Sequence, residues 1–271
     1  MLQPDQDPEL WNLFARPYET VFEPLTDQFV AHALQALSPL RGARLLDICA
    51  GSGGAALMAA AAGAHVTAID ASPAMVARIE SRAVERADGS IAARVMDAAA
   101  LDLPAASFDG ALSCFGVVLL PDPGAALGEI ARILRPGARL ALITWTEPQS
   151  YELAARLRRA AQAQGFGAPP QGPTPAQLRY AEPASLTALL TDAGYEVLEL
   201  RRMTGALRAP SAEWLGEHLG FAPGLAAMLD SFGGRRGAVV ESFLRRLTAD
   251  QGPGPVSLSA VAHMAVASTP A

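Results

Sequence analysis

The sequence predicts an α/β fold: a doubly wound, mostly parallel, seven-stranded sheet with N-terminal helices and a helical cap. Short apolar runs alternate with helical patterns between residues 43 and 145, and the connections between them are short. These runs are almost continuously apolar, which is typical of parallel strands covered on both faces. A helical stretch of about fifty residues separates the last two predicted strands, too long for a hairpin connection, and it indicates the cap.

The first forty residues predict an N-terminal helical lid. Apolar residues recur there at three- and four-residue spacing and form one helix face: Leu25, Phe29, Ala33, Leu34 and Leu37. The next hundred residues predict five strands and three helices. The strands are 43–49, 65–69, 91–96, 110–115 and 138–145, and the helices lie near 53–62, 73–87 and 123–134. Ser72 and Asp122 each precede a proline and are suited to cap the second and third helices.

The second half of the chain predicts further elements in a looser pattern. They are a helix at 151–164, a Gly/Pro-rich loop at 165–175, a helix at 183–193, a strand at 195–203, helices near 211–219, 223–231 and 235–248, and a strand at 256–267. We therefore divide the chain into a lid at 1–40, a core at 41–204 and 254–271, and a cap at 205–253.

Composition excludes several classes of function. The 271 residues carry 21 basic and 27 acidic side chains, a formal charge of −6, so we expect no nucleic-acid and no membrane partner. All basic residues are arginine, which excludes a lysine Schiff base and a Walker-type phosphate loop. Two cysteines are too few for an iron–sulfur cluster or a cysteine-rich zinc site, and we predict no metal.

The chain start favours a cytoplasmic protein with reduced thiols. It shows no charged region followed by an apolar one, as a secretory leader has. The longest apolar run, at 53–64, is too short to span a bilayer and contains glycines.

The segment 45–54, LLDICAGSGG, carries the clearest functional signal. An apolar strand runs into a turn of small residues and then a helix. Gly51 and Gly53 permit positive φ angles and close approach of a ligand, and the helix start offers free N–H groups. From these residues alone, a dinucleotide-binding turn and an adenosyl-binding turn both stay open.

Two acids strengthen the signal. Asp70 ends the second predicted strand, and Asp97-Ala98 follows the third. Ligands in such sheets bind beyond the carboxyl ends of the strands. A carboxylate at Asp70 can accept hydrogen bonds from both ribose hydroxyls, and Asp97 with the Ala98 N–H can read an adenine edge. The alternative is that Asp70 caps the next helix and Asp97 lies in a turn.

The segment 47–53 resembles the first motif of class I S-adenosylmethionine-dependent methyltransferases. The resemblance continues through 68–79 (AIDASPAMVARI), 95–104 (VMDAAALDLP), 108–123 (FDGALSCFGVVLLPDP) and 132–145 (RILRPGARLALITW). It is greatest to the quinone-biosynthesis-like, small-molecule branch. It implies a Rossmann-like fold and S-adenosyl-L-methionine as the cofactor.

The resemblance also implies roles for cofactor-binding residues. Asp47 would orient the cofactor's amino group, and Gly51 and Gly53 would pass its methionine portion. Cys49 stands where the family has its first glycine. The remaining positions are Asp70 at the ribose, Ala71 beside the adenine, Asp97 and Ala98 at the adenine edge, and Ser113 near the methionine carboxylate or the methyl group.

Tyr18 lies in an N-terminal segment that, in such relatives, closes over the cofactor. Phe14, Tyr18 and Phe22 are four apart, so they fit either a lid turn, since Pro17 interrupts the helix, or a helical apolar stripe. Cys49 and Cys114 end strands that are neighbours in the doubly wound order, which places both thiols near the cofactor crevice.

The reaction class itself requires no particular catalytic side chain. Methyl transfer from a sulfonium can proceed by alignment and exclusion of water. We take His218, in the cap, as the candidate general base, with Tyr18 as a second candidate. Weaker candidates are Tyr151, Tyr180 and Glu147. His263 lies late in the last strand, and we expect it to point away from the site. Apolar cap residues would line an acceptor pocket: Trp214, Leu215, Leu219, Phe221 and Leu225.

The sequence therefore predicts an enzyme that methylates a small, largely apolar metabolite, in biosynthesis. An alternative is a cyclase or other non-methylating enzyme that binds S-adenosylmethionine on the same fold. A more distant alternative is an NAD(P)-dependent oxidoreductase, against which Asp47 argues. A homodimer stays open, and so does the acceptor atom.

Overall fold

The fold is organised around one seven-stranded sheet in the order β3-β2-β1-β4-β5-β7-β6. The computed structural model describes residues 2–83, 89–167 and 174–270. The strands are β1 Arg44–Ile48, β2 His65–Asp70, β3 Ser90–Val95, β4 Phe108–Cys114, β5 Leu134–Trp145, β6 Glu196–Ala209 and β7 Val256–Ser268. β1 to β5 pair in parallel, and β7 runs antiparallel to both β5 and β6. The predicted doubly wound, mostly parallel sheet is confirmed.

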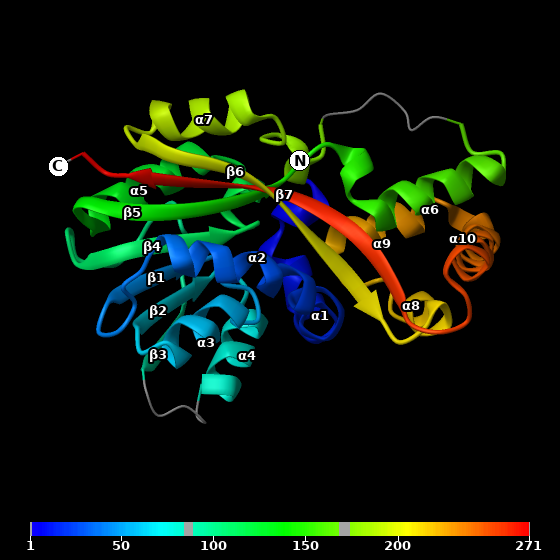
Figure 1. Cartoon of the computed structure of the whole chain (residues 1–271), viewed down its shortest axis with the longest axis horizontal. Helices are drawn as coiled ribbons and strands as arrows, with labels where there is room; N and C mark the ends of the chain where they lie inside the picture. Colours follow the sequence, from blue (N-terminus) through cyan, green and yellow to red (C-terminus); the bar gives the residue numbers. More distant parts are fainter. Residues whose placement is uncertain (1, 84–88, 168–173, 271) are drawn as a thin grey trace.

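Helices cover both faces of this sheet (Figure 1). The α-helices are α1 Pro8–Pro17, α2 Glu23–Ala36, α3 Gly54–Ala61, α4 Pro73–Ala83, α5 Pro123–Ile133, α6 Glu152–Ala163, α7 Pro183–Asp192, α8 Ala212–Glu217, α9 Pro223–Asp230 and α10 Arg236–Gln251. Short turns of other helix types are η1 Pro4–Gln6, η2 Tyr18–Phe22, η3 Val117–Leu119, η4 Pro148–Ser150, η5 Ala176–Leu178 and η6 Gly233–Arg235.

The predicted helix starts follow from side-chain caps. The Met75 N–H donates to Ser72 Oγ (3.2 Å), and the Ala125 N–H donates to Asp122 Oδ1 (3.0 Å), so α4 and α5 begin where the sequence indicates. The end of the predicted helix 73–87 and most of the predicted loop 165–175 lie outside the described residues.

Two apolar layers pack on the sheet. One lies under α2, α3 and α4 and includes Phe29, Ala56 and Ile79; the other lies under α5 and α7 and includes Leu127 and Leu186. The first layer continues without interruption into α6 and α8 to α10. The sheet and the cap therefore share one core on the α2 side.

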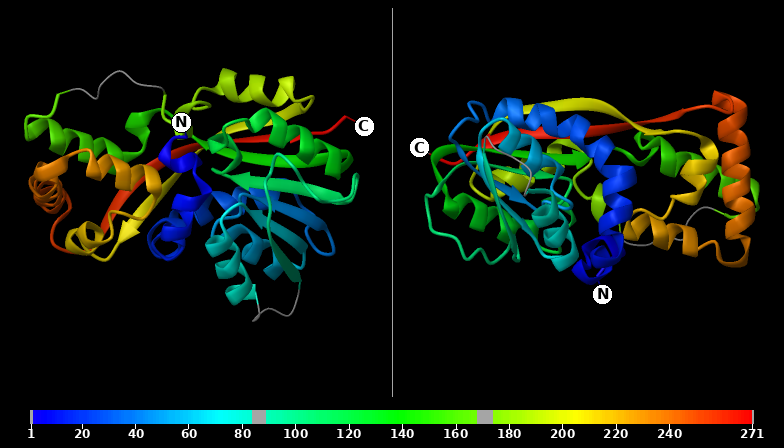
Figure 2. Two further views of the ribbon diagram at one scale, coloured as in Figure 1. Left: turned by 180° about the vertical axis from the view of Figure 1, so that it is seen from behind. Right: turned by 90° about the horizontal axis from the view of Figure 1, so that it is seen from below.

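The cap is carried by two long strands. β6 extends six residues beyond the predicted end at 203, and with β7 it forms a two-stranded arm that projects past β5 (Figures 1 and 2). The helices α8 and α10 lie at the end of this arm, and α9 packs back against η1 and α1. α6, which the prediction places in the core, packs against α10, and Arg156 pairs with both Glu152 and Asp250. The domain boundaries stay a prediction.

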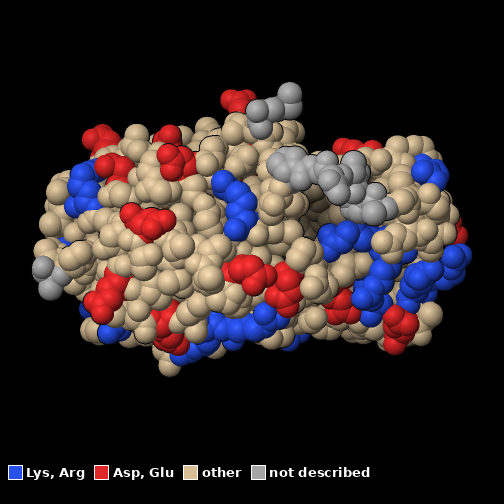
Figure 3. All heavy atoms as spheres, turned by 90° about the horizontal axis from the view of Figure 1, so that it is seen from above, with Lys and Arg blue, Asp and Glu red and all other residues tan. Residues whose placement is uncertain are grey.

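The surface carries both signs of charge. On the face in Figure 3, acidic side chains are spread over the sheet end, and arginine side chains gather toward the cap end. Among the described residues, no helix has the length and apolar character needed to cross a membrane.

Candidate functional site

The turn after β1 has an unusual backbone. Cys49, Gly51 and Gly53 all adopt positive φ angles, of +54°, +56° and +94°. Glycine is suited to this conformation, whereas a cysteine there is strained by about 1 kcal/mol or more. Gly116 leaves room for the Cys49 side chain, because a side chain at Gly116 would overlap Cys49 Cβ. The turn thus keeps the shape expected from the motif despite the substitution at its first glycine.

Asp70 connects this turn to β2. Its Oδ2 accepts the Gly51 N–H (2.9 Å) and its Oδ1 accepts the Ser72 N–H (2.9 Å). Burial raises the pKa of the carboxyl to about 6, and the backbone hydrogen bonds oppose that rise. An ionised carboxylate has about four acceptor positions, so two remain for a ligand such as a ribose diol.

The end of β3 supplies a second polar position. Asp97 is exposed two residues beyond the strand, and its Oδ1 accepts the Ala99 N–H (2.9 Å). Ala98 beside it is buried. The two predicted adenine-reading residues thus stand on the same edge as Asp70 and follow the strand next to β2. Their role stays a prediction.

Asp47 lies inside β1 with its side chain 1% exposed. It accepts a hydrogen bond from the Ala56 N–H of α3, but burial dominates and raises its pKa to about 7. Its Oδ2 is buried and has no hydrogen-bond partner among the described residues. A buried acceptor left unpaired is costly, so this oxygen is suited to a ligand.

The N-terminal segment, residues 4–36, covers the turn. Pro17 does not break the helix: α1 passes through the π-helical turn η2 into α2. π-Helical turns are rare and occur at functional sites more often than elsewhere. The ring of Tyr18 lies over Gly51, with its Cε1 3.5 Å from where a side chain at Gly51 would begin. The sequence left open a lid turn or a continuous helical stripe. The structure has the continuous helix, and the Tyr18 side chain on it covers the turn.

Ionic contacts fasten α2 to the turn and to α4. The Glu23 carboxylate accepts hydrogen bonds from Ser52 Oγ and from Arg82, whose Nη1 also donates to the Ser52 carbonyl (2.8 Å). Glu19 pairs with Arg78 at 2.7 Å. These side chains hold the N-terminal segment against the edge of the sheet.

A cavity of about 20 Å³ remains between α2 and the turn, enough for roughly one water molecule. It is lined by Tyr18, Glu23, Thr26, Asp27, Val30, Asp47, Cys49, Ala50, Gly54, Ala55 and Cys114. The predicted neighbours Cys49 and Cys114 thus meet at the cavity, and both thiols are free. Burial raises the pKa of each thiol well above its usual range.

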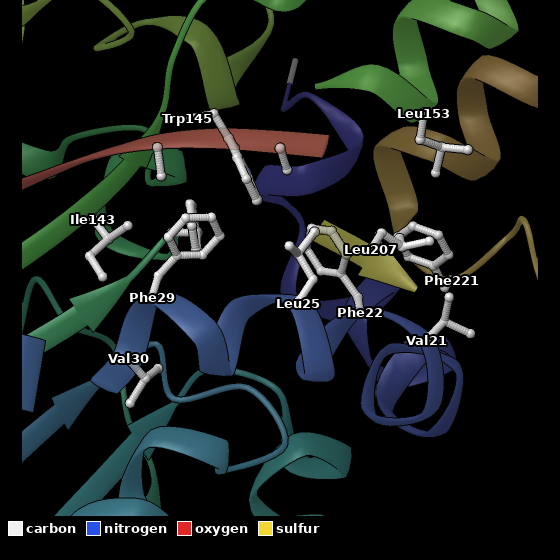
Figure 4. Close-up of a cluster of buried hydrophobic side chains, with 14 of the residues drawn as sticks. Val21, Phe22, Leu25, Phe29, Val30, Ile143, Trp145, Leu153, Leu207 and Phe221 are labelled. Carbon is white, nitrogen blue, oxygen red and sulfur yellow. The ribbon is translucent and has the colours of Figure 1, made fainter. Parts of the chain in front are cut away.

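Aromatic rings fill the adjoining region, between the ends of β4 and β5, the N-terminal segment and the cap. Trp145 stacks on Phe115 and Tyr151, with centroids 3.9 and 5.4 Å away. Phe22 lies between Trp145 (5.8 Å) and the cap residue Phe221 (5.1 Å) (Figure 4). We call Phe22, Phe115, Trp145, Tyr151 and Phe221 the aromatic cluster. The Tyr151 hydroxyl is buried in it without a partner among the described residues.

The predicted catalytic residues fall in different places. Tyr18 lines the cavity. His218 stacks on Trp214 (centroids 4.1 Å apart) with its Nδ1 2.8 Å from the Trp214 carbonyl oxygen, at the end of α8, which lies far along the arm from β1 (Figure 1). The structure does not bring His218 to the cavity. Glu147 is ion-paired with Arg202, which holds its pKa far below the usual range, so it is a poor base.

Ser113 and His263 make contacts that the sequence does not predict. Ser113 donates to the Ile48 carbonyl (2.9 Å) and accepts the Val117 N–H (3.0 Å), so its hydroxyl ties β4 to β1 and does not line the cavity. The expectation that His263 points to the remote edge is wrong. His263 pairs with Thr144 near the carboxyl end of β5, because the first half of β7 projects beyond the sheet.

Sequence reasoning missed Glu23 and Asp27, and it did not foresee that Tyr151, a weaker base candidate, lies in an aromatic cluster. Glu23 and Asp27 are four residues apart, which places both acids on one face of α2. Acids in an amphipathic helix are normally solvated, and the packing of α2 on α3 turns these two inward.

Comparison with known proteins agrees with this geometry. Residues 46–142 match the family model described as a methyltransferase domain. The demethylmenaquinone methyltransferase of Clavibacter sepedonicus is 35% identical over 116 residues, 42% of this chain and 46% of that protein. Uncharacterized mycobacterial proteins match at 37 to 40% identity, and the chain spans less than half the length of these relatives.

One relative matches over most of its length. The nocamycin O-methyltransferase of Saccharothrix syringae is 31% identical over 238 residues, 83% of this chain and 84% of that protein. The chain belongs to the class I S-adenosylmethionine-dependent methyltransferases. S-Adenosylmethionine is the cofactor of this family, and the glycine turn, Asp47 and Asp70 fit it.

The solved structure of the [4+2]-cyclase SpnF shares the fold. Its TM-score is 0.55 at 22% identity, over 90% of this methyltransferase chain and 80% of the cyclase chain. At this identity the likeness shows the fold alone.

Proposed function

We propose that this methyltransferase transfers the methyl group of S-adenosylmethionine to a small, largely apolar metabolite in a cytoplasmic biosynthetic reaction. The observation that carries the proposal is the pairing of two chemically different sites at one sheet edge. Asp47 and Asp70 with the glycine turn suit a polar cofactor. The aromatic cluster beside them suits an apolar acceptor.

The residues divide the work between binding and positioning. Asp70 would accept the ribose hydroxyls, Asp97 and Ala98 would hold the adenine, and Asp47 with the turn would hold the methionine portion. When bound, the cofactor supplies an electrophilic methyl group on a sulfonium. The aromatic cluster would align the acceptor and exclude water, which is enough to accelerate a displacement of this kind.

The N-terminal segment would act as the lid. A cavity of about 20 Å³ is far smaller than the roughly 300–1,000 Å³ of typical ligand pockets. Tyr18 and Phe22 would therefore move outward to admit the ligands and return to cover them. Tyr18 and His218 remain candidate bases, and the unpartnered Tyr151 hydroxyl is a third.

Product analysis tests the proposal. The protein is incubated with methyl-labelled S-adenosylmethionine and panels of phenols, quinols, carboxylic acids and amines, and labelled products and S-adenosylhomocysteine are measured by mass spectrometry. Oxygen acceptors come first, because a relative that matches most of this chain is named an O-methyltransferase. We expect label in an apolar acceptor, and none with Asp70→Ala. Consumption of a substrate without methyl loss would instead support the cyclase alternative.

A further inference from the structure

A second acid faces the cavity from the N-terminal segment. Asp27 Oδ1, on α2, is buried and has no hydrogen-bond partner among the described residues, as is true of Asp47 Oδ2 from β1. Two elements distant in sequence thus each direct one unsatisfied carboxylate oxygen toward the same small space.

The third acid at the cavity is satisfied. Glu23 is bound by Ser52 and by both terminal nitrogens of Arg82, and Arg82 Nη1 also binds the Ser52 carbonyl. No basic side chain is among the residues that line the cavity. The two free oxygens therefore lack a cation within the described lining.

The unfavourable burial of these two carboxylates raises the pKa of both groups. Burial, with the nearby charge of Glu23, raises the pKa of Asp27 to about 6, and Arg82 opposes the rise. Burial raises the pKa of Asp47 to about 7. Two ionised carboxylates buried near each other are costly, and protonation lowers that cost. A cation between them would lower it while both stay ionised.

Gly54 makes the position of Asp27 feasible. A side chain at this first residue of α3 would overlap Asp27 Oδ1 and crowd Glu23. The acid on α2 can approach the turn this closely only because residue 54 is glycine.

We propose that Asp27 is a cofactor-binding residue that, together with Asp47, holds the cationic amino group of the methionine portion. The inference rests on the proposed function. In this arrangement the amino group of the ligand bridges Asp47 on the sheet and Asp27 on the N-terminal segment. Binding would therefore hold α2 against the cofactor.

Calorimetric titration with two ligands tests the inference. The first ligand is S-adenosylhomocysteine, and the second is its deaminated analogue, which keeps the carboxylate. For the wild type, we expect the first to bind more tightly. Asp27→Asn should weaken S-adenosylhomocysteine by about 10- to 100-fold, as expected for a charge-assisted hydrogen bond, and leave the analogue within about twofold.

Two further variants complete the experiment. Gly54→Ala displaces the Asp27 carboxylate without removing it and should give the same selective loss, which keeps the test usable if Asp27→Asn fails to fold. Asp102→Asn, an exposed acid beyond the end of β3, should change neither affinity.

The outcomes separate the two proposals. Equal weakening of both ligands by Asp27→Asn, or no weakening of either, would overturn the role of Asp27 alone. Equal wild-type affinity for the two ligands would do the same. Failure of the wild type to bind S-adenosylhomocysteine would overturn the proposed function and this inference with it.

Discussion

The sheet edge at the ends of β1 and β2 is built from carboxylates and backbone N–H groups, whereas the edge at the ends of β4 and β5 is built from aromatic rings. In the first region each acid occupies a position set by the backbone, as Asp70 does through Gly51 and Ser72. In the second region, four rings from three separate parts of the chain pack on Trp145. The polar groups at the ends of β1 and β2 are therefore positioned mainly by nearby residues, whereas the aromatic cluster is assembled by packing between distant segments.

The largest expected effect comes from the aromatic region. Phe221→Ala removes a buried ring that stacks on Phe22. The free energy of unfolding should fall by about 3–5 kcal/mol, as for other buried Phe→Ala changes. The affinity of the native fraction for S-adenosylhomocysteine should change by less than about threefold, because Phe221 contacts none of the cofactor acids. Urea denaturation and calorimetry measure the two quantities; a parallel loss of cofactor affinity would show that the two regions are not separate.

The next effect comes from the polar region. Asp70→Ala should weaken S-adenosylhomocysteine by about 100-fold or more, because a carboxylate with two ligand hydrogen bonds is lost. Asp97→Ala should weaken it less, since that side chain is exposed. Asp102→Ala is the matched control and should bind as the wild type does. Equal affinities of all four proteins would place the cofactor elsewhere.

The polar region should also give stability a distinctive pH dependence. Asp27, Asp47 and Asp70 have pKa values raised to about 6, 7 and 6 by burial, so the folded state holds protons that the unfolded chain releases near pH 4. The free energy of unfolding of the free protein should therefore fall as the pH rises from about 4 to 7.

Asp47→Asn tests the source of that slope. It should remove about 2 kcal/mol of the fall, in urea denaturation at pH 5 and pH 7. Affinity for S-adenosylhomocysteine in the wild type should rise over the same interval, because ionised carboxylates bind the amino group. A stability that rises steadily between pH 5 and 7, unchanged in Asp47→Asn, would contradict the assignment of the raised pKa values.

The smallest effect concerns the strained turn. Cys49→Gly should relieve the positive φ angle and raise the free energy of unfolding by about 0.5–1 kcal/mol, less whatever thiol packing is lost. Cofactor affinity should stay the same or improve. Destabilisation by more than about 1 kcal/mol would mean that the thiol contributes more through packing than the strained backbone costs.

The same contrast explains how much the sequence could predict. Glycines, helix caps and acids at strand ends are local signals, so the turn, the position of Asp70 at the end of β2 and the starts of α4 and α5 are predicted correctly. The alternation of apolar runs and helices was enough for the sheet, and the long connection before β7 indicated the cap.

The missed features depend on packing between distant segments. The Gly205–Ala209 end of β6 has no β-branched or aromatic residue, and it becomes a strand because β7 pairs with it along its length. Asp27 turns inward because α2 packs on α3, and Tyr151 enters the aromatic cluster through contact with Trp145. The direction of His263 depended on how far the arm projects, which the length of the strand pattern does not reveal.

The most direct test of the account is equilibrium binding of S-adenosylhomocysteine and of NADH to the wild-type protein, followed by calorimetry and thermal unfolding. We expect S-adenosylhomocysteine to bind one per chain and to stabilise the fold by about 2.7 kcal/mol at a hundredfold excess over its dissociation constant. NADH should neither bind nor stabilise. Absence of S-adenosylhomocysteine binding, or equal binding of NADH, would contradict the assignment of the β1 and β2 edge as an adenosylmethionine site.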